Sequence, residues 1–366
     1  MDTLLYHETG STDPAFNLAL EEALAEAECS AGRLLLWQNA PAVIIGRHQN
    51  ACAEVNLPAL KKWGVQLVRR LTGGGAVYHD LGNLNFTFIL PLGRMEEISP
   101  AQVLAPMLDY LSSLGLDVGM EGRNDITLKG GGKISGLASR RLPGKFLLHG
   151  TLLYDVNLTR LADVLLVDPA KYRSKGVQSV RARVCNLRGH TDISLQALWQ
   201  GIRAAYAPPA AAGPAPAAPL PLPLVERAKK LQAERYTQDS WNLGMSPPGD
   251  ICLAGRFAFG SLELYLGVRG SRINQARICG DFLTAHASGP LPEVEALAQA
   301  LLGLPAHAPE TWAAAWQKFD FSRIFLHCKQ GEEILDWLAR GSRSGSASGP
   351  ASGSASGSAS GAGRPE

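Results

Sequence analysis

Apolar residues recur at helical spacing in several stretches of the first 206 residues. The clearest stretch runs from Phe16 to Leu24, where glutamates separate the apolar positions, and Asp13-Pro14 before it is a typical helix start. The same spacing predicts helices over residues 99–114 and 195–206 and a shorter one over 158–166.

Short apolar runs bounded by turn residues predict strands between these helices. A turn at Asn39-Ala40-Pro41 joins the first two of these runs. Because strands follow one another closely, with helices interspersed, their order favours a mixed, largely antiparallel sheet over a doubly wound parallel one, so we expect an α+β fold. The predicted strands are Leu34–Trp37, Val43–Ile45, Val65–Val68, Asp125–Leu128, Ile134–Ala138 and Leu147–Tyr154.

The pattern changes after residue 206. Residues 207–223 are almost entirely alanine and proline, which is typical of a semi-rigid extended spacer, and a charged helix is expected over 225–236. From Trp241 a small α+β unit follows, with strands near 257–259, 262–266 and 273–278 and helices near 292–302 and 309–317. The Ser/Gly/Ala repeats from Gly341 predict a disordered tail. We therefore divide the chain into domains over 1–243 and 244–340 and a tail over 341–366.

Composition narrows the class of protein. The chain has 366 residues, of which 46% are hydrophobic and 19% charged, so a sizeable core is expected, and a formal net charge of +2 argues against a strongly basic nucleic-acid binder. The six cysteines are scattered without a Cys-x-x-Cys pair, which disfavours structural zinc and a disulfide scaffold. No run approaches the roughly 18 apolar residues of a membrane helix, and no signal peptide is visible, so we expect a cytoplasmic protein without membrane partners.

The strongest functional signal is the segment Arg69-Arg70-Leu71-Thr72-Gly73-Gly74-Gly75. Glycines let a backbone approach a ligand closely, successive N–H groups form an anion site, and arginines add forked donors for phosphate. A short strand-like segment follows, not the Gly-Lys-Ser/Thr of a Walker loop and not the helix of a dinucleotide fold. The chemistry indicated is nucleotide phosphate binding, although a glycine hinge between two strands would give the same pattern.

A second glycine-rich segment, Gly130-Gly131-Gly132, precedes Lys133 at the start of a predicted strand. A lysine in this position can point its ammonium into a cleft, where it would attract both a carboxylate and a phosphate. Lys129 is the local rival, and spacing alone does not choose between the two. For His149 and Asp125, structural roles as a hydrogen-bonded histidine and a turn cap stay open. A metal site built from His79, Asp80 and His149 lacks ligand spacing.

Together and in order, these segments resemble the lipoate–protein ligases of the A type, over about residues 3 to 340. The resemblance implies a mixed-sheet catalytic domain, shared with biotin–protein ligases and octanoyl transferases, followed by a small accessory domain. The matching segments are Gly46–Asn50, Arg69–Asp80, Gly82-Asn83, Gly122–Asp125, Lys133–Gly136, His149–Leu152 and Val180–Leu187.

The resemblance also implies a reaction in two steps. Lipoate and Mg-ATP give lipoyl-adenylate and pyrophosphate, and the lipoyl group then passes to a lysine of an acceptor. The acceptors implied are lipoyl domains of 2-oxoacid dehydrogenase acyltransferase subunits and the glycine-cleavage H protein. No nucleic-acid partner is implied.

The family's functional residues map onto this sequence position by position. Lys133 is implied as the catalytic residue that bridges the lipoate carboxylate and the α-phosphate, and Asp125 as a Mg ligand. Residues implied to bind ATP are Arg70, Gly75, Ala76, Val77, Tyr78, Asn83, Asp125, Lys133, Thr151, Arg181 and Ala182. Residues implied to bind lipoate are Thr72, His79, Lys133, Ser135, Gly136, Ala138 and His149.

Three departures from the family pattern keep alternatives open. Leu148 replaces the first of two histidines, the loop before Lys133 is only three glycines, and Cys185 lies in the motif of the adenylate loop. A cysteine there suggests an octanoyl or lipoyl transferase that needs no ATP, with His190 as a nearby base. The Gly-Arg-Gly-Arg-type loop of biotin–protein ligases is missing. A non-catalytic module that binds lipoyl carriers is the third alternative.

Overall fold

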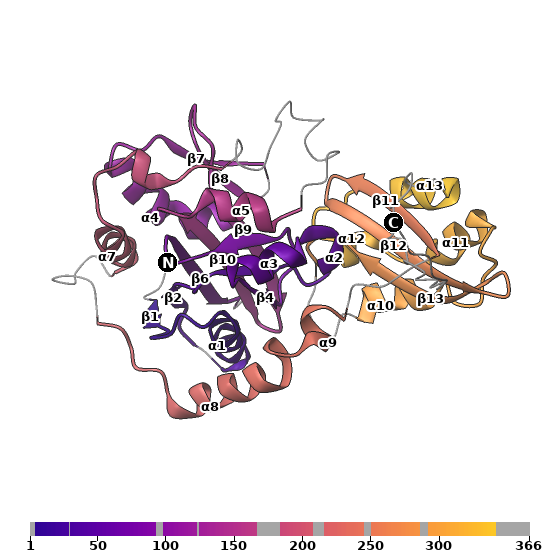
Figure 1. Ribbon diagram of the computed structural model, residues 1–366, viewed down its shortest axis with the longest axis horizontal. Coiled ribbons are helices and arrows are strands. Elements are labelled where there is room, and N and C mark those ends of the chain that lie inside the picture. Colours follow the sequence, from indigo (N-terminus) through magenta and orange to yellow (C-terminus); the bar gives the residue numbers. More distant parts are fainter. Residues whose placement is uncertain are drawn as a thin grey trace, which may run out of the picture.

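A seven-stranded sheet forms the centre of the N-terminal part of the protein (Figure 1). The structure is a computed structural model that describes residues 4–28, 30–92, 98–122, 124–166, 184–207, 216–244, 250–285 and 292–341. The strand order is β1 (Leu5–Glu8), β2 (Arg33–Trp37), β6 (Asn83–Pro91), β10 (Lys145–Leu153), β9 (Lys133–Leu142), β8 (Asp125–Leu128) and β7 (Val118–Glu121). β1 and β2 pair in parallel, and the other neighbours named here pair antiparallel. The prediction of a mixed, largely antiparallel sheet is confirmed.

A second, three-stranded sheet has the order β4 (Gln66–Arg69), β3 (Ala42–Ile45) and β5 (Val77–His79). β3 pairs in parallel with β4 and antiparallel with β5. The strands predicted on either side of the Asn39–Pro41 turn are present as β2 and β3, but they belong to different sheets. The turn therefore passes the chain from one sheet to the other.

Helices α4 (Pro100–Ser113) and α7 (Leu195–Ala205) cover one face of the large sheet. Their apolar side chains pack against Phe86 and Phe88 of β6. α4 begins where sequence analysis places it, because Ser99 forms a capping box with Gln102.

The opposite face packs against α1 (Pro14–Glu26), α8 (Leu222–Leu231) and the second sheet. α1 starts at the predicted residue, since the Asp13 carboxylate accepts hydrogen bonds from the N–H groups of Ala15 and Phe16 at 2.9 and 3.4 Å. Side chains alternate along a strand, so this face also presents a series of buried polar residues from β6 and β10. They are Asn83, Asn85, Thr87, His149 and Thr151.

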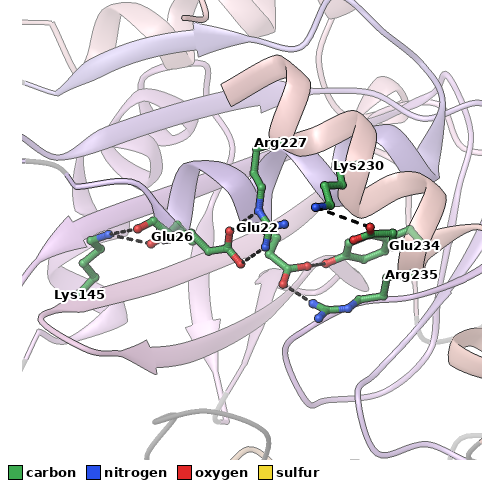
Figure 2. Close-up of polar contacts among 9 residues, drawn as sticks. Glu22, Glu26, Lys145, Arg227, Lys230, Glu234 and Arg235 are labelled. Carbon is green, nitrogen blue, oxygen red and sulfur yellow. Dashed lines mark hydrogen bonds and ion pairs between the residues drawn. The ribbon is translucent and has the colours of Figure 1, made fainter. Parts of the chain in front are cut away.

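Polar contacts fasten α8 and the π-helical turn η2 (Gln232–Tyr236) to α1 (Figure 2). Arg227 donates to Glu26 at 2.8 and 3.0 Å, and Arg235 pairs with Glu22. The Tyr236 hydroxyl donates to the other oxygen of Glu22 at 2.7 Å, so this buried carboxylate has partners on both oxygens. The charged helix predicted over 225–236 is thus a helical brace across α1.

Part of the predicted alanine- and proline-rich spacer lies along the edge of the large sheet. The N–H of Ala218 donates to the Tyr6 carbonyl at 2.7 Å, while residues 208–215 lie outside the described part of the chain.

The shorter helices of the N-terminal part are α2 (Ala51–Glu54), α3 (Leu57–Trp63), α5 (Leu158–Val164), the 3-10 turn η1 (Leu187–Gly189) and α9 (Asp239–Asn242).

The C-terminal part contains a three-stranded antiparallel sheet packed against helices (Figure 1). The sheet is β11 (Ile251–Phe257), β12 (Gly260–Arg269) and β13 (Arg272–Cys279), and the helices are α10 (Pro292–Gln299), α11 (Pro309–Trp316), α12 (Phe321–Ile324) and α13 (Glu332–Arg340). This agrees with the predicted small α+β unit, although α12 and α13 were not predicted. Phe282 stacks on His48 of the N-terminal part with ring centroids 4.6 Å apart.

Within the described residues, no helix has the length and apolar character needed to cross a membrane.

Candidate functional site

A cleft with about 550 Å³ of empty space, part of it open to solvent, lies between the polar face of the large sheet and the second sheet. Its apolar wall combines Leu18, Trp37, Ile44, Val77, Leu137 and Ala138. Its polar side chains are Arg70, His79, Asn85, Asn124, Lys133, His149 and Thr151. An elongated apolar acyl chain with one charged end suits such a lining.

Lys133 projects into this cleft from the start of β9. Its ammonium lies 2.7 Å from the Asp125 carboxylate on neighbouring β8, and both side chains are largely buried. A Cβ on Gly136 would lie 3.0 Å from the Lys133 Nζ, so the glycine leaves room for the ammonium. The rival Lys129 is 81% exposed and pairs with Asp117 outside the cleft. The structure therefore places Lys133, and not Lys129, in the cleft.

Arg70 and Arg69 are occupied by the protein itself. The guanidinium of Arg70 donates to Thr72 Oγ1 and to the carbonyls of Ile44, Gly73 and Gly75, over 2.6–3.1 Å. Burial lowers its pKa to about 10, so it stays charged at neutral pH. Arg69 is fully buried, and its donors go to backbone carbonyls of residues 46, 47, 49, 241 and 242. Both side chains therefore shape the loops, and the role of Arg70 at the ATP phosphates stays a prediction.

The glycines of this loop are needed for close packing. A Cβ on Gly73 would lie 2.0 Å from the carbonyl oxygen of Phe282 in the C-terminal part, and one on Gly74, where φ is +89°, would lie 2.9 Å from Arg70. The loop is therefore held from one side by Arg70 and covered on the other by Phe282.

His149 is held by partners at both ring nitrogens. Nδ1 lies 2.8 Å from Glu21 Oε1, and Nε2 lies 2.8 Å from Thr72 Oγ1. Arg70 already donates to Thr72 Oγ1, so the hydroxyl proton of Thr72 can donate to Nε2 while Nδ1–H donates to the carboxylate. Glu21 also accepts from Thr87 at 2.7 Å. The network fixes the imidazole at one end of the cleft.

His79 presents an N–H donor to the cleft. Backbone carbonyls orient the Asn17 amide, whose nitrogen donates to Asn39 Oδ1 at 2.9 Å. The Asn39 nitrogen must then donate to His79 Nδ1 at 3.0 Å, which leaves the proton on Nε2. Burial lowers the pKa of His79 to about 3, so the ring is neutral. Nε2 is buried and has no hydrogen-bond partner within the described residues.

The structure brings most of the sequence-predicted site residues together. Those that line the cleft are Arg70, Gly75, Ala76, Val77, His79, Lys133, Gly136, Ala138, His149 and Thr151. Thr72, Asn83 and Asp125 lie behind it and contact His149, Asn85 and Lys133. Tyr78 and Ser135 are buried but do not line it, and burial raises the pKa of Tyr78 to about 12. Arg181 and Ala182 lie outside the described residues.

Three residues of the site were not predicted from the sequence: Glu21, Trp37 and Asn85. A glutamate at a buried position of the apolar stripe of α1 was the available signal for Glu21, and a polar residue between Leu84 and Phe86 was the signal for Asn85.

Two further sequence expectations concern Mg and Cys185. Mg²⁺ is commonly held by one or two carboxylates together with substrate phosphates, and Asp125 fits that mode. The described residues include no group of three or more His, Cys, Asp and Glu placed to hold a metal without a nucleotide.

The Cys185 thiol donates to the Gly132 carbonyl at 3.4 Å, and burial raises its pKa. These contacts favour a neutral thiol over an activated nucleophile.

Comparisons with known proteins agree with this geometry. Residues 13–207 match the family model of the lipoyl protein ligase A/B catalytic domain, and residues 246–338 match the bacterial lipoate protein ligase C-terminus. The chain is 34% identical over 288 residues to lipoate-protein ligase LplJ of Bacillus subtilis, covering 78% of this chain and 86% of that protein.

Solved structures show the same fold. LipL1 of P. falciparum, in complex with lipoate, superposes with a TM-score of 0.69 at 24% identity over 92% of this chain and 99% of that one. A lipoate-protein ligase A bound with ATP gives 0.55 at 28% identity, over 66% and 98% of the chains. A bipartite lipoate protein ligase of Thermoplasma acidophilum, described with its E2 lipoyl domain, gives 0.57 at 29% identity, over 69% and 100%.

Proposed function

The chain belongs to the family of lipoyl protein ligase A/B catalytic domains and is a ligase of the lipoate–protein ligase class, and from this premise we propose that it activates lipoate with ATP and transfers the lipoyl group to a protein lysine. The observation that supports the proposal most directly is the Lys133–Asp125 pair in an otherwise largely apolar cleft. The ATP-bound relative supports nucleotide use by the same fold.

In the proposed activation step, a lipoate carboxylate oxygen attacks the α-phosphorus of ATP. A C–O–P linkage forms, and pyrophosphate leaves with the electron pair of the broken P–O bond. The Lys133 ammonium would offset the repulsion between the two anions, which is a preorganised electrostatic contribution. Mg²⁺, when bound at Asp125, would supply further positive charge to the phosphates. The apolar wall would keep water away from the mixed anhydride.

In the proposed transfer step, a lysine amine of the acceptor takes the acyl group and releases AMP. The Thermoplasma relative, described with its E2 lipoyl domain, supports lipoyl domains as acceptors. We extend the proposal to the lipoyl domains of 2-oxoacid dehydrogenase acyltransferase subunits and to the glycine-cleavage H protein. Arg181 and Ala182 are proposed to cover the adenylate.

Pyrophosphate release without acceptor tests the activation step. The purified protein is incubated with Mg-ATP and lipoate, octanoate or biotin in parallel reactions. We expect release with lipoate and little with biotin. Absence of lipoate-dependent pyrophosphate, together with lipoyl transfer that needs no ATP, would instead identify a transferase, and inactivity of Cys185→Ser would then locate its nucleophile.

A further inference from the structure

The side-chain amide nitrogen of Asn85 is buried, and no acceptor among the described residues forms a hydrogen bond with it. Asn83 Nδ2 donates to Asn85 Oδ1 at 2.8 Å, and this bond occupies the carbonyl end of the Asn85 amide. Asn83 Oδ1 and Asn85 Nδ2 are both buried without a partner among the described residues, and of the two side chains it is Asn85, 1% exposed, that lines the cleft. Buried N–H donors are nearly always satisfied, so a donor left over in a binding cleft indicates an acceptor on the ligand.

The strand register places this donor in line with Lys133. Asn85 on β6 lies directly opposite Thr151 on β10. Thr151 Oγ1 in turn accepts from the N–H of Gly136 on β9 at 3.1 Å, and the Lys133 ammonium lies over Gly136. Asn85, Thr151 and the lysine therefore form one row across three strands, on the face that borders the cleft.

A lipoyl or octanoyl chain has its oxygen acceptors only at the carboxyl end. If Lys133 holds that end, the row of side chains puts Asn85 on the same side of the cleft as the acyl carbonyl. Trp37, which flanks Asn85 on β2, has its own N–H bound to Thr87 at 3.1 Å. We propose that Asn85 Nδ2 donates a hydrogen bond to the acyl carbonyl oxygen of the adenylate and stabilises the oxyanion formed during transfer, an inference that rests on the proposed function.

Transfer is a nucleophilic acyl substitution at the acyl carbon of the adenylate. The neutral amine of the acceptor lysine adds to the acyl carbon, a C–N bond forms, and the π pair of the carbonyl moves onto oxygen. The oxyanion then collapses, the bond from the acyl carbon to the phosphate oxygen breaks, and AMP leaves with that electron pair. The surplus proton of the amine passes to the departing phosphate or to water. A donor at the carbonyl oxygen lowers the barrier to the addition.

The test compares the two half-reactions in the full-length protein and three variants. Asn85→Leu removes the donor at similar volume, Asn85→Ser keeps a hydroxyl donor, and Phe86→Leu perturbs the same strand on its opposite, core-facing side. Adenylation is followed as lipoate-dependent pyrophosphate release, and transfer as single-turnover acylation of a lipoyl domain by enzyme loaded with lipoyl-adenylate. The infrared carbonyl band of bound, ¹³C-labelled lipoyl-adenylate reports the hydrogen bond itself.

We expect Asn85→Leu to slow transfer by about 10²-fold, the typical loss for one oxyanion donor, and to slow adenylation by much less. In Asn85→Leu the carbonyl band should move to higher frequency. Asn85→Ser should recover part of the transfer rate and part of the band shift. Phe86→Leu should leave both the ratio of the two half-reaction rates and the carbonyl band as they are in the wild type. Equal loss in both half-reactions, or an unmoved carbonyl band, would overturn the inference. A wild-type protein that releases no pyrophosphate with lipoate would count against the proposed function, a result distinct from either.

Discussion

Glu21 of α1 holds the ring of His149 on β10 through a 2.8 Å contact between Oε1 and Nδ1, across 128 positions of sequence. The same oxygen accepts the hydroxyl of Thr87, and the carboxylate is 1% exposed. A single carboxylate oxygen thus joins a helix to two strands of the sheet at one end of the cleft. Charge-assisted hydrogen bonds of this kind are stronger than neutral ones, so the carboxylate contributes to stability as well as to the shape of the cleft.

We expect Glu21→Ala to lower the free energy of unfolding by about 2–4 kcal/mol, because it leaves the donors of His149 and Thr87 buried without acceptors. Glu21→Gln keeps an acceptor oxygen and should cost about 1 kcal/mol. Urea unfolding checks both values. Glu26→Gln is the control, since Glu26 pairs with Arg227 on the surface of the same helix and should cost less than 1 kcal/mol. A loss of similar size in Glu26→Gln and Glu21→Ala would contradict this account.

The relation between Gly136 and Lys133 gives a second prediction. An added Cβ would come within 3.0 Å of the ammonium and 3.2 Å of Lys133 Cε, so Gly136→Ala should displace the ammonium and leave the fold intact. We expect lipoate-dependent pyrophosphate release to fall by about tenfold or more, because even a small displacement of a group that positions the substrates lowers the rate strongly. Gly119→Ala, with no atom within 4 Å of the added Cβ, is the matched control and should retain full activity.

Lysine substitution separates the two candidates named from the sequence. Lys133→Ala should abolish adenylate formation with a far-ultraviolet circular dichroism spectrum like that of the wild type, because the ammonium is proposed to offset the charge of both substrates. Lys129→Ala should leave the rate within about twofold, since its ion pair with Asp117 is exposed and outside the cleft. The reverse pattern would show that the cleft ammonium has another role.

Much of the fold could be predicted from the sequence because it depends on local patterns. Asp13 caps α1 and Ser99 caps α4, and each of these signals is visible in one segment of chain. The placement of Lys133 behind a glycine loop was also a local pattern. The partners of Arg70 and Glu21 were not, because these side chains bond to backbone carbonyls and to a histidine that only the folded sheets bring within reach. Charge and the neighbouring glycines suggested that Arg70 serves a phosphate, which stays a prediction, but its bonds to the loop were not visible in the sequence.

Arg70→Lys tests whether the loop contacts of Arg70 are needed for ATP binding. A lysine keeps the charge but cannot make the forked set of bonds to Thr72 and the three carbonyls, so the loop loses its brace. We expect the free energy of unfolding to fall by about 2–4 kcal/mol and the KM for ATP to rise by about tenfold or more. Arg188→Lys, at an exposed pair with Asp155, serves as the control and should change stability by less than 1 kcal/mol. Full retention of ATP affinity in Arg70→Lys would show that the charge alone suffices.

Buried neutral histidines make stability depend on pH. Burial lowers the pKa of His79 to about 3 and holds the pKa of His48, stacked on Phe282, well below its usual value. In the unfolded chain both rings take up a proton near pH 6.5, so below that pH the unfolded state binds more protons than the folded state. The contribution of these two neutral histidines to the free energy of unfolding is therefore fully present above about pH 6.5. It is lost as the pH decreases, by up to about 1.4 kcal/mol per pH unit for each histidine.

We expect the free energy of unfolding, measured in urea between pH 5.0 and 7.5, to rise with pH over the acidic half of that range. His79→Gln removes one titrating group and should reduce the slope below pH 6 by up to about 1.4 kcal/mol per pH unit, while it lowers the absolute stability because the Asn39 contact is altered. An unchanged slope in His79→Gln would mean that this ring takes up its proton in the folded state, and the donor assigned to Nε2 would then have to be reconsidered.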